Sequence, residues 1–256
     1  MLLTVDVGNT HIRLGVFPAD DGPLERTWSV CTSPAVTSDE LALTIRGLLG
    51  ECAQRLTGIA AMSVVPSVTG ELRRMAADYW PEVPTVVVAP GVKTGVPLLV
   101  DNPREVGSDR VVNALAAHAL YDGAVVVVDV DTATTVDAVS ARGELLGGAI
   151  APGIDISVDA LAERAAALRK IEVVRPRGAL GKNTVAALQA GIVIGFAGQI
   201  DALVDRLREE VDGLADASVV LTGMRADVVA SESRTVTDVE HELALEGLRL
   251  VFERNA

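Results

Sequence analysis

An aspartate followed by a small polar turn stands near the start of the chain. Asp6 ends a short apolar run, and Gly8, Asn9 and Thr10 come directly after it. A carboxylate at a strand end can face a metal ion, glycine lets a ligand approach the backbone, and the turn adds hydroxyl, amide and N–H groups. Oxygen ligands and N–H donors of this kind suit a magnesium-bound phosphate. The turn is therefore a candidate phosphate-binding loop.

The same arrangement occurs a second time near the middle of the chain. The segment 128–133 (VDVDTA) aligns with 5–10 (VDVGNT), so that Asp129 takes the place of Asp6. After each turn, alternating apolar residues predict a second strand that returns alongside the first. The two hairpins suggest two related domains, each presenting one phosphate loop.

The order of the predicted elements fits such a pair of domains. The first half reads as three strands followed by helix, strand, helix and strand, which is an α/β pattern. This order resembles the ribonuclease-H-like halves of the sugar kinase, actin and Hsp70 superfamily. We expect one domain over 1–118 and a second over 119–256, facing each other across a central cleft.

A third polar cluster stands at the start of a helix predicted over 111–120. Its residues are Gly107, Ser108, Asp109 and Arg110. Serine or aspartate at a helix start often does no more than cap the helix. Alternatively, Asp109 accepts a proton from a substrate hydroxyl and Arg110 binds an anionic group. The local sequence leaves both interpretations open.

A long helix is predicted over 185–211, directly after the segment GKNT at 181–184. Gly191, Gly195 and Gly198 recur along it at three- and four-residue spacing. Such a smooth face suits close helix packing, either inside the chain or across a dimer. No strand directly precedes these glycines, so they do not form a dinucleotide-binding fingerprint.

Composition and charge limit the classes of function. Of the 256 residues 49% are apolar but only 3% are aromatic, so the core must consist mostly of aliphatic side chains. The net charge of −13 argues against sequence-independent binding to nucleic acid or to an anionic membrane surface. The strongest apolar run, 124–128, is far too short to span a bilayer.

The two cysteines and the N-terminus suggest a cytoplasmic protein. Cys31 and Cys52 show no metal-ligand spacing, and we expect buried thiols in a reducing compartment, with a disulfide as the less favoured alternative. The first predicted strand begins at once, with no signal peptide before it.

Taken together, the motifs resemble those of type III pantothenate kinases over essentially the whole chain. They are DVGNT (6–10), DNPREVGSDR (101–110), VDVDTATTVD (128–137), GGAIAPG (147–153) and GKNT (181–184). The resemblance implies transfer of the γ-phosphoryl group of ATP to the primary hydroxyl of pantothenate, giving 4'-phosphopantothenate in the first step of coenzyme A biosynthesis. It also implies homodimers with composite active sites, and a need for Mg²⁺ and a monovalent cation, K⁺ or NH4⁺.

The resemblance also assigns roles to individual residues, with Asp109 as the general base. ATP would be bound by Asp6, Val7, Gly8, Asn9, Thr10, His11, Ile12, Arg13 and Thr132. Pantothenate would be bound by Gly107, Ser108, Asp109 and Arg110, and by Thr184 from the neighbouring subunit. Asp6 would lie near Mg²⁺, and Asp129 would bind the monovalent cation.

The chain departs from the family pattern at three positions. Asp131 stands where the second phosphate loop usually has glycine, Met224 replaces a second glycine near the nucleoside, and Val100 replaces a tyrosine beside the substrate. An anionic side chain beside phosphate is unfavourable unless a cation offsets it. A catalytically impaired homologue with a binding or regulatory role is therefore the alternative interpretation.

The second hairpin also resembles a different enzyme motif. VVVVDVDTA is similar to the D-x-D-x-T/V motif of haloacid-dehalogenase-type phosphatases, in which Asp129 would be the nucleophile and Asp131 the acid/base. However, Ala133 stands at the fifth position, and the first hairpin and 107–110 remain without a role. Pantothenate-dependent consumption of ATP would separate the kinase from both alternatives.

Overall fold

Two compact units make up the chain in the computed structural model, which describes residues 1–19, 22–165 and 168–256. Unit 1 comprises Met1–Val96, Asn102–Ala116 and Leu243–Ala256. Unit 2 comprises Pro97–Asp101 and Ala117–Glu242.

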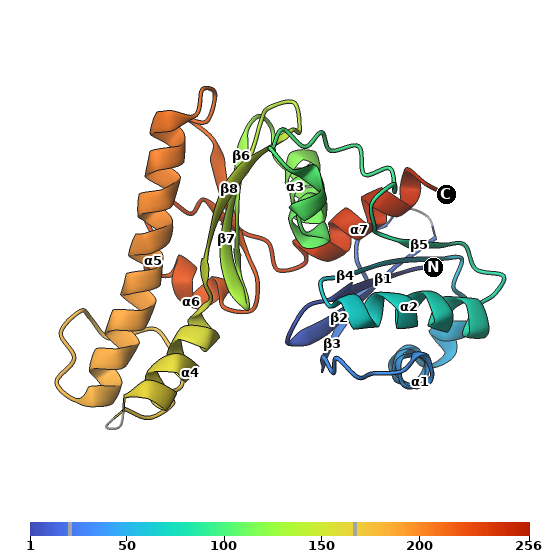
Figure 1. Ribbon diagram of the computed structural model, residues 1–256, viewed down its shortest axis with the longest axis horizontal. Helices are drawn as coiled ribbons and strands as arrows, with labels where there is room; N and C mark the ends of the chain where they lie inside the picture. The colour runs from blue at the N-terminus through green and yellow to red at the C-terminus, as the bar shows by residue number, and fades with distance from the viewer. Residues whose placement is uncertain (20–21, 166–167) are drawn as a thin grey trace. The chain divides into compact units, whose positions relative to one another are not determined.

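The sheet of unit 1 has five strands in the order β3-β2-β1-β4-β5 (Figure 1). β1 (Leu2–Val7) pairs antiparallel with β2 (His11–Phe17), which pairs antiparallel with β3 (Arg26–Cys31). On the other side of β1, β4 (Gly58–Ser63) and β5 (Thr85–Val87) continue the sheet in parallel.

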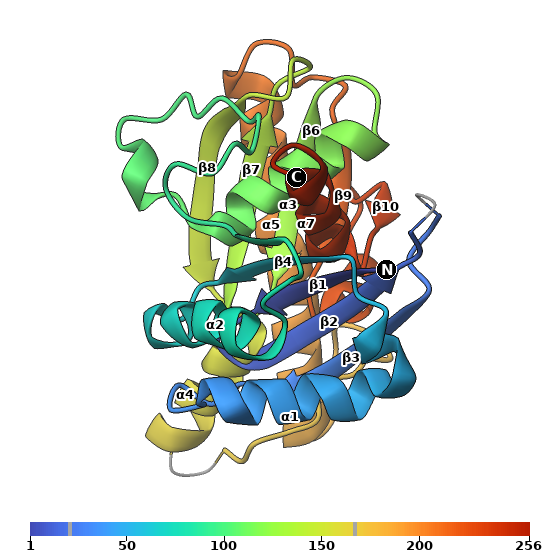
Figure 2. The ribbon, with the colours of Figure 1, turned by 90° about the vertical axis from the view of Figure 1, so that its right-hand side faces the viewer.

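Helices cover both faces of this sheet. α1 (Ser38–Leu49) and α2 (Pro66–Tyr79) lie side by side on one face, as Figure 2 shows. Leu3, Val5 and Val7 of β1 pack in one core cluster with apolar residues of these helices. Because side chains alternate along a strand, the residues between them face the opposite side, where α7 (Leu243–Glu253) packs on β1 and β4. Short 3₁₀ helices occupy Gly50–Gln54 and Pro103–Glu105.

The sheet of unit 2 repeats the same topology. Its order is β10-β9-β6-β7-β8, with β6 (Val125–Val130) central. β7 (Ala133–Val139) and β8 (Leu145–Pro152) follow as antiparallel neighbours, whereas β9 (Ser218–Thr222) and β10 (Asp238–Val239) pair in parallel.

The core of unit 2 is aliphatic, as the composition predicts. α4 (Ile154–Arg164), α5 (Thr184–Glu210) and the short α6 (Ala226–Ala230) pack against the sheet. Val126 and Val128 of β6 are fully buried in one cluster with Val193 and Ile200 of α5. α3 (Ser108–Leu120) begins in unit 1 and ends in unit 2.

The repeated topology confirms the predicted fold class. β1 and β6 share one burial pattern along their six residues, and β2 and β7 share another along their seven. Each unit is therefore an α/β ribonuclease-H-like domain whose first two strands form the hairpin that the sequence predicted.

Some details differ from the sequence analysis. α7, which we expected within 119–256, belongs to unit 1, because its apolar side packs on the first sheet. α3 begins at Ser108, three residues earlier than predicted. Cys31 is exposed rather than buried, since β3 is an edge strand, and both cysteines are free thiols.

By length and composition alone, α5 is long and apolar enough to cross a membrane. It has 27 residues, and its most apolar window has a mean hydropathy of 1.5. One such helix is weak evidence, because the core helix of a soluble domain can be equally long and apolar. Here the buried residues of α5 pack in the core of unit 2.

Asp201 of α5 ties that helix to the loop before β10. Asp201 is 7% exposed, and its carboxylate accepts hydrogen bonds from the hydroxyls of Ser233 and Thr235, each at 2.7 Å, and from two backbone N–H groups. Burial raises the pKa of Asp201, but these hydrogen bonds outweigh it and hold the pKa below the ordinary value of 3.8.

We expect Asp201→Asn to lower the free energy of unfolding by about 2 kcal/mol at neutral pH, because an amide accepts fewer of these bonds. A carboxylate with a lowered pKa stabilises the fold above its unfolded-state pKa and stops doing so as pH falls through its folded-state pKa. The stability difference between the two proteins should therefore shrink as pH falls below 3.8. Urea unfolding at several pH values measures this. A difference that stays constant down to pH 2 would contradict it.

Candidate functional site

The turn between β1 and β2 forms the first candidate phosphate loop. Gly8 N–H donates to the His11 carbonyl at 2.9 Å and closes the turn, while Asn9 and Thr10 at its tip are exposed. On one side, Val64 N–H donates to the Val7 carbonyl at 3.0 Å. The loop therefore projects from a base that is fixed by the sheet.

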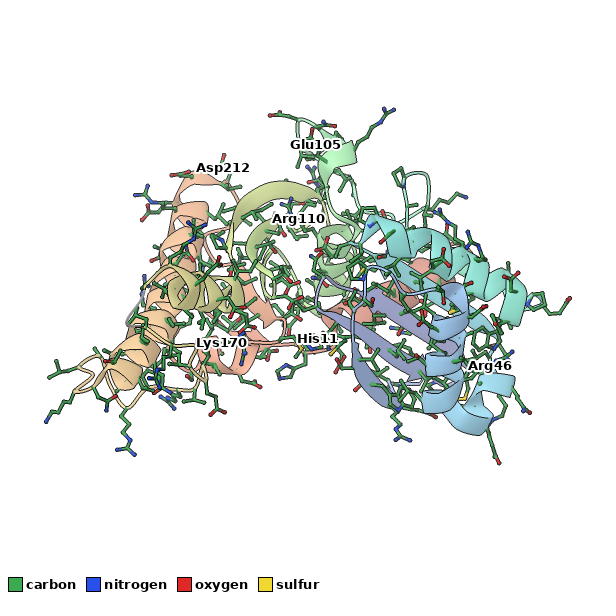
Figure 3. The ribbon with its side chains drawn as sticks, turned by 60° about the horizontal axis from the view of Figure 1, so that its bottom comes forward. His11, Arg46, Glu105, Arg110, Lys170 and Asp212 are labelled. Carbon is green, nitrogen blue, oxygen red and sulfur yellow. The ribbon has the colours of Figure 1, made fainter. Side chains whose placement is uncertain are left out.

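The predicted ATP-binding residues 6–13 divide into two groups. Asp6 and Arg13 are half-buried and stand opposite each other in the β1–β2 ladder. His11 is the first residue of β2 and follows the turn directly (Figure 3). In contrast, the side chains of Val7 and Ile12 are buried in the core of unit 1, so only their backbone can face a ligand. The alternation of side chains along each strand explains the division.

The residues predicted to bind the second substrate lie in the first turn of α3. Val111 N–H donates to the Gly107 carbonyl at 3.3 Å, which makes Gly107 the residue that opens the helix. Ser108, Asp109 and Arg110 follow and are half-buried. The Asp109 carboxylate folds back over Gly107, because a Cβ built on Gly107 would lie 2.3 Å from Asp109 Oδ1. The positive end of the helix dipole favours an anion at this position.

The turn between β6 and β7 forms the second candidate phosphate loop, in unit 2. Asp131 N–H donates to the Ala133 carbonyl at 3.0 Å, much as Gly8 does in the first loop. Asp129 stands opposite Thr135, so this loop is one residue shorter than the first, in which Asp6 stands opposite Arg13. The Thr132 hydroxyl is buried, and among the described residues it has no hydrogen-bond partner.

Gly153 packs against the backbone of this second loop. Its N–H donates to the Thr132 carbonyl at 3.1 Å. A Cβ at this position would lie 2.1 Å from the carbonyl oxygen of Asp131 and 2.4 Å from that of Thr132. No side chain fits in that space, so the end of the GGAIAPG motif has a steric reason for its glycine.

Gly223 packs against the other side of the same loop. It has a φ of +97°, and a Cβ there would lie 2.6 Å from both Asp129 Oδ1 and the Val130 carbonyl oxygen. The next helix is held nearby, since Arg225 N–H donates to the Val130 carbonyl and the Arg225 guanidinium forms two hydrogen bonds with Asp155 at 2.8 and 3.2 Å.

The donor atoms available here suit hard cations that also bind phosphate oxygens. The described residues contain no group of three or more His, Cys, Asp or Glu side chains that could hold a metal alone. Mg²⁺ commonly takes one or two carboxylates and completes its shell with water and substrate phosphates. Asp6 in the first loop and Asp129 in the second can each supply such a carboxylate.

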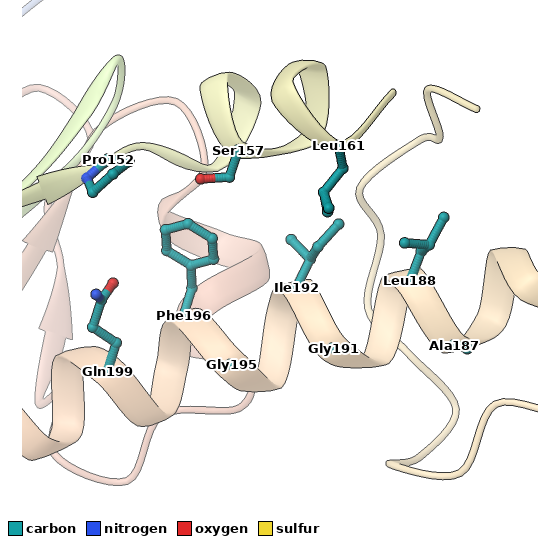
Figure 4. Close-up of a pocket in the computed structure, with 10 residues that line it drawn as sticks. All are labelled: Pro152, Ser157, Leu161, Ala187, Leu188, Gly191, Ile192, Gly195, Phe196 and Gln199. Carbon is teal, nitrogen blue, oxygen red and sulfur yellow. The ribbon is translucent and has the colours of Figure 1, made fainter. Parts of the chain in front are cut away.

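Thr184 is the first residue of α5 and is exposed. The Asn183 side chain caps the helix by accepting from Ala186 N–H at 2.9 Å. Further along α5, a groove of about 460 Å³ runs between this helix, α4 and the end of β8 (Figure 4). Gly191 and Gly195 belong to its lining, and both have open space where a Cβ would be.

Sequence reasoning assigned no role to three residues that shape the loops. Thr32 binds the backbone of the first loop, and Gly153 and Gly223 contact the second. The GGAIAPG motif contains Gly153, whereas Gly223 stands beside Met224, one of the positions at which the chain departs from the family pattern. Nothing in the sequence marks Thr32.

Solved structures with the same fold include a protein with bound ADPNP and a kinase. The activator of 2-hydroxyisocaproyl-CoA dehydratase from Clostridium difficile, solved with bound ADPNP, superimposes with a TM-score of 0.59 at 11% identity, covering 99% of this chain and 94% of that one. The polyphosphate/ATP-glucomannokinase from an Arthrobacter strain has a TM-score of 0.54 at 13% identity, covering 100% and 99%. At these identities the likeness establishes the fold of the sugar kinase, actin and Hsp70 superfamily.

Comparison of sequences identifies the family. The model of type III pantothenate kinases matches residues 2–206. The type III pantothenate kinase of Rhodococcus erythropolis is 58% identical over 100% of this chain and 96% of its own length. The chain belongs to the type III pantothenate kinase family, and it is a phosphotransferase of the kinase type. The phosphatase interpretation of the second hairpin is therefore wrong.

Proposed function

We propose that the chain transfers the γ-phosphoryl group of ATP to the primary hydroxyl of pantothenate, the first step of coenzyme A biosynthesis. The family match over residues 2–206 carries this proposal, because that range contains both phosphate loops, the start of α3 and Thr184. Phosphoryl transfer has a loose transition state, so positioning and charge neutralisation matter more than covalent chemistry. Preformed loops at the ends of rigid strands suit that requirement.

Asp109 is the general base in this proposal. It accepts the proton of the pantothenate hydroxyl as the bond to phosphorus forms. Its place in the first turn of α3, beside Gly107, supports the assignment because the carboxylate is held on a rigid element. Arg110 and Ser108 bind the substrate from the same turn, and Thr184 binds it from a second copy of the chain.

Mg²⁺ and a monovalent cation, K⁺ or NH4⁺, are the proposed cofactors. Asp6 would hold Mg²⁺ together with phosphate oxygens, and Asp129 would hold the monovalent ion. When bound, these ions neutralise the negative charge of the triphosphate, which a protein with a net charge of −13 would otherwise repel. Thr132 binds ATP in the second loop, and Asn9 and Thr10 bind it at the tip of the first loop.

Asp131 is expected to weaken ATP binding without abolishing activity. Two like charges about 4 Å apart in water repel by about 1 kcal/mol, which corresponds to about a fivefold change in affinity. We therefore expect Asp131→Gly to lower the KM for ATP about fivefold and to leave the KM for pantothenate unchanged. Initial rates at varied concentrations of each substrate measure both. A raised KM for ATP would mean that Asp131 recruits a cation the loop needs.

The proposed assembly is a homodimer whose interface includes the groove beside α5. The proposed location is the cytoplasm. The groove has an exposed apolar side chain in its lining, since Leu161 is 40% exposed, and Ile156 on the same helix is 49% exposed. Small residues on α5 let a partner helix approach closely. A second copy that covers this surface would bury the apolar side chains, and Thr184 lies at the start of the same helix.

We expect the chain to sediment at twice its mass of 26.6 kDa. Gly195→Lys places a charge in the groove where a Cβ meets no neighbour, so it should yield monomers that remain folded. Gly70→Lys, on the exposed side of α2, is the matched control and should remain dimeric. Analytical ultracentrifugation separates the outcomes. Dimers of Gly195→Lys would place the interface elsewhere.

A coupled assay of ADP release tests the proposed activity. With Mg²⁺ and K⁺ present, ADP release should require pantothenate. ATP hydrolysis at the same rate without pantothenate would contradict the substrate assignment. Absence of turnover in a folded protein would favour a binding or regulatory homologue.

A further inference from the structure

Thr32 contacts the first phosphate loop from outside the β1–β2 hairpin. It follows the last residue of β3 and is 24 residues from Gly8 in the chain. Its hydroxyl donates to the Gly8 carbonyl at 2.8 Å, and its N–H donates to the Thr10 carbonyl at 2.9 Å. One residue therefore holds the carbonyl groups on both sides of Asn9.

These two contacts determine which way the loop's N–H groups point. In a trans peptide the C=O and the N–H of one unit point in opposite directions. Because Thr32 binds the Gly8 carbonyl, the Asn9 N–H of the same peptide unit points away from Thr32. In the described part of the chain, Asn9 N–H donates no hydrogen bond. It is therefore available to an oxyanion, which binds where backbone N–H groups converge.

The two hydrogen bonds of Thr32 differ in whether they require a particular side chain. Almost any residue could make the N–H bond, because it continues the β2–β3 pairing. Only serine or threonine at this position could donate the hydroxyl bond to Gly8. The base of the hairpin is held separately by Val64 on the β4 side, so loss of the hydroxyl frees the loop tip and leaves the hairpin in place.

We propose that Thr32 is a positioning residue for ATP. Its hydroxyl holds the Gly8–Asn9 peptide in the orientation that presents N–H to a phosphate oxygen of the nucleotide. The inference rests on the proposed function, in which this loop binds ATP. Thr32 should therefore affect the affinity for the nucleotide and leave the affinity for pantothenate unchanged.

Nucleotide binding by Thr32→Val and Thr32→Ser tests the inference. Valine keeps the shape and the N–H but removes the hydroxyl, whereas serine keeps the hydroxyl. Isothermal titration with Mg²⁺ and a non-hydrolysable ATP analogue measures affinity without turnover. We expect Thr32→Val to weaken binding about five- to tenfold, the equivalent of one hydrogen bond, and Thr32→Ser to restore it. The KM for ATP should rise by the same factor, with the KM for pantothenate unchanged.

Thr85→Val is the matched control. The Thr85 hydroxyl also donates to a backbone carbonyl, that of Val83 at 3.1 Å, on another strand of the same sheet. We expect its nucleotide affinity to equal that of the unaltered chain.

Three results would overturn the inference in distinguishable ways. Unchanged affinity in Thr32→Val would show that the hydroxyl does not position the loop. Equal loss of affinity and thermal stability in both Thr32 variants would make the residue purely structural. Failure of the unaltered chain to bind the analogue would remove the proposed function as well, whereas the first two results would leave that function intact.

Discussion

Asp109→Asn should produce a folded protein whose kcat is lower by about 10²- to 10⁴-fold, the usual contribution of a general base. The amide has nearly the same shape as the carboxylate but cannot accept the proton of the substrate hydroxyl. Asp109 is half-buried in the first turn of α3, and the helix begins with the backbone of Gly107 rather than with a side-chain cap from Asp109. The fold therefore does not depend on the ionised carboxylate.

Single-turnover rates with saturating ATP and pantothenate measure this effect on the chemical step. Asp212→Asn removes one carboxylate from an exposed loop of unit 2 and should retain full activity. Circular dichroism and thermal unfolding show whether each variant is folded. Full activity of folded Asp109→Asn would remove Asp109 from the role of base.

Gly153→Ala should have the second-largest effect, by displacing the second phosphate loop. The new methyl group would overlap the carbonyl oxygens of Asp131 and Thr132, which belong to backbone and cannot rotate away. With a φ of −76°, Gly153 has a conformation that alanine also adopts, so the effect comes from overlap alone. We expect kcat/KM for ATP to fall about 100-fold, as for a misplacement of about 1 Å, and unfolding free energy to fall by about 1–3 kcal/mol.

Gly47→Ala supplies the control for Gly153→Ala. Gly47 lies on the exposed side of α1, where a Cβ meets nothing within 4 Å. Alanine there should raise the free energy of unfolding by up to about 1 kcal/mol, because glycine is a poor helix former, and activity should not change. Steady-state kinetics and urea unfolding of both variants test the pair. Normal ATP kinetics in Gly153→Ala would show that the loop tolerates the displacement.

Local patterns in the sequence were sufficient to predict both hairpins. Each contains period-two alternation and a polar turn within fewer than 20 residues, and the structure gives the two hairpins matching burial patterns. The helices that pack on one apolar face, α1 and α2, were predictable for the same reason. The start of α3 was predicted three residues too late, because Gly107 and Ser108 can belong either to a loop or to a helix start.

Contacts between distant parts of the chain could not be read from these patterns. α7 is separated from β1 by more than 200 residues, yet it packs on that strand, and its amphipathic pattern does not say which sheet it covers. Thr32, Gly153 and Gly223 contact the loops only because strands and turns bring them there. A single threonine hydroxyl, or a glycine without a side chain, does not by itself indicate in the sequence that the residue contacts a distant loop.

Burial determines which residues of the first phosphate motif can contact a ligand through their side chains. Val7 and Ile12 lie inside the phosphate motif but belong to the core, whereas Asn9 and Thr10 at the tip remain accessible. A motif that matches a family therefore specifies a loop conformation as well as ligand contacts.

Phosphorus NMR of the reaction mixture tests the central claim most directly. With ATP, Mg²⁺, K⁺ and pantothenate, a new phosphomonoester resonance should grow as the γ-phosphate resonance of ATP declines, and it should couple to the protons of the adjacent CH₂ group. That result would establish transfer to the primary hydroxyl. Accumulation of inorganic phosphate with no ester resonance, or no change in ATP, would contradict the assignment of this chain as a pantothenate kinase.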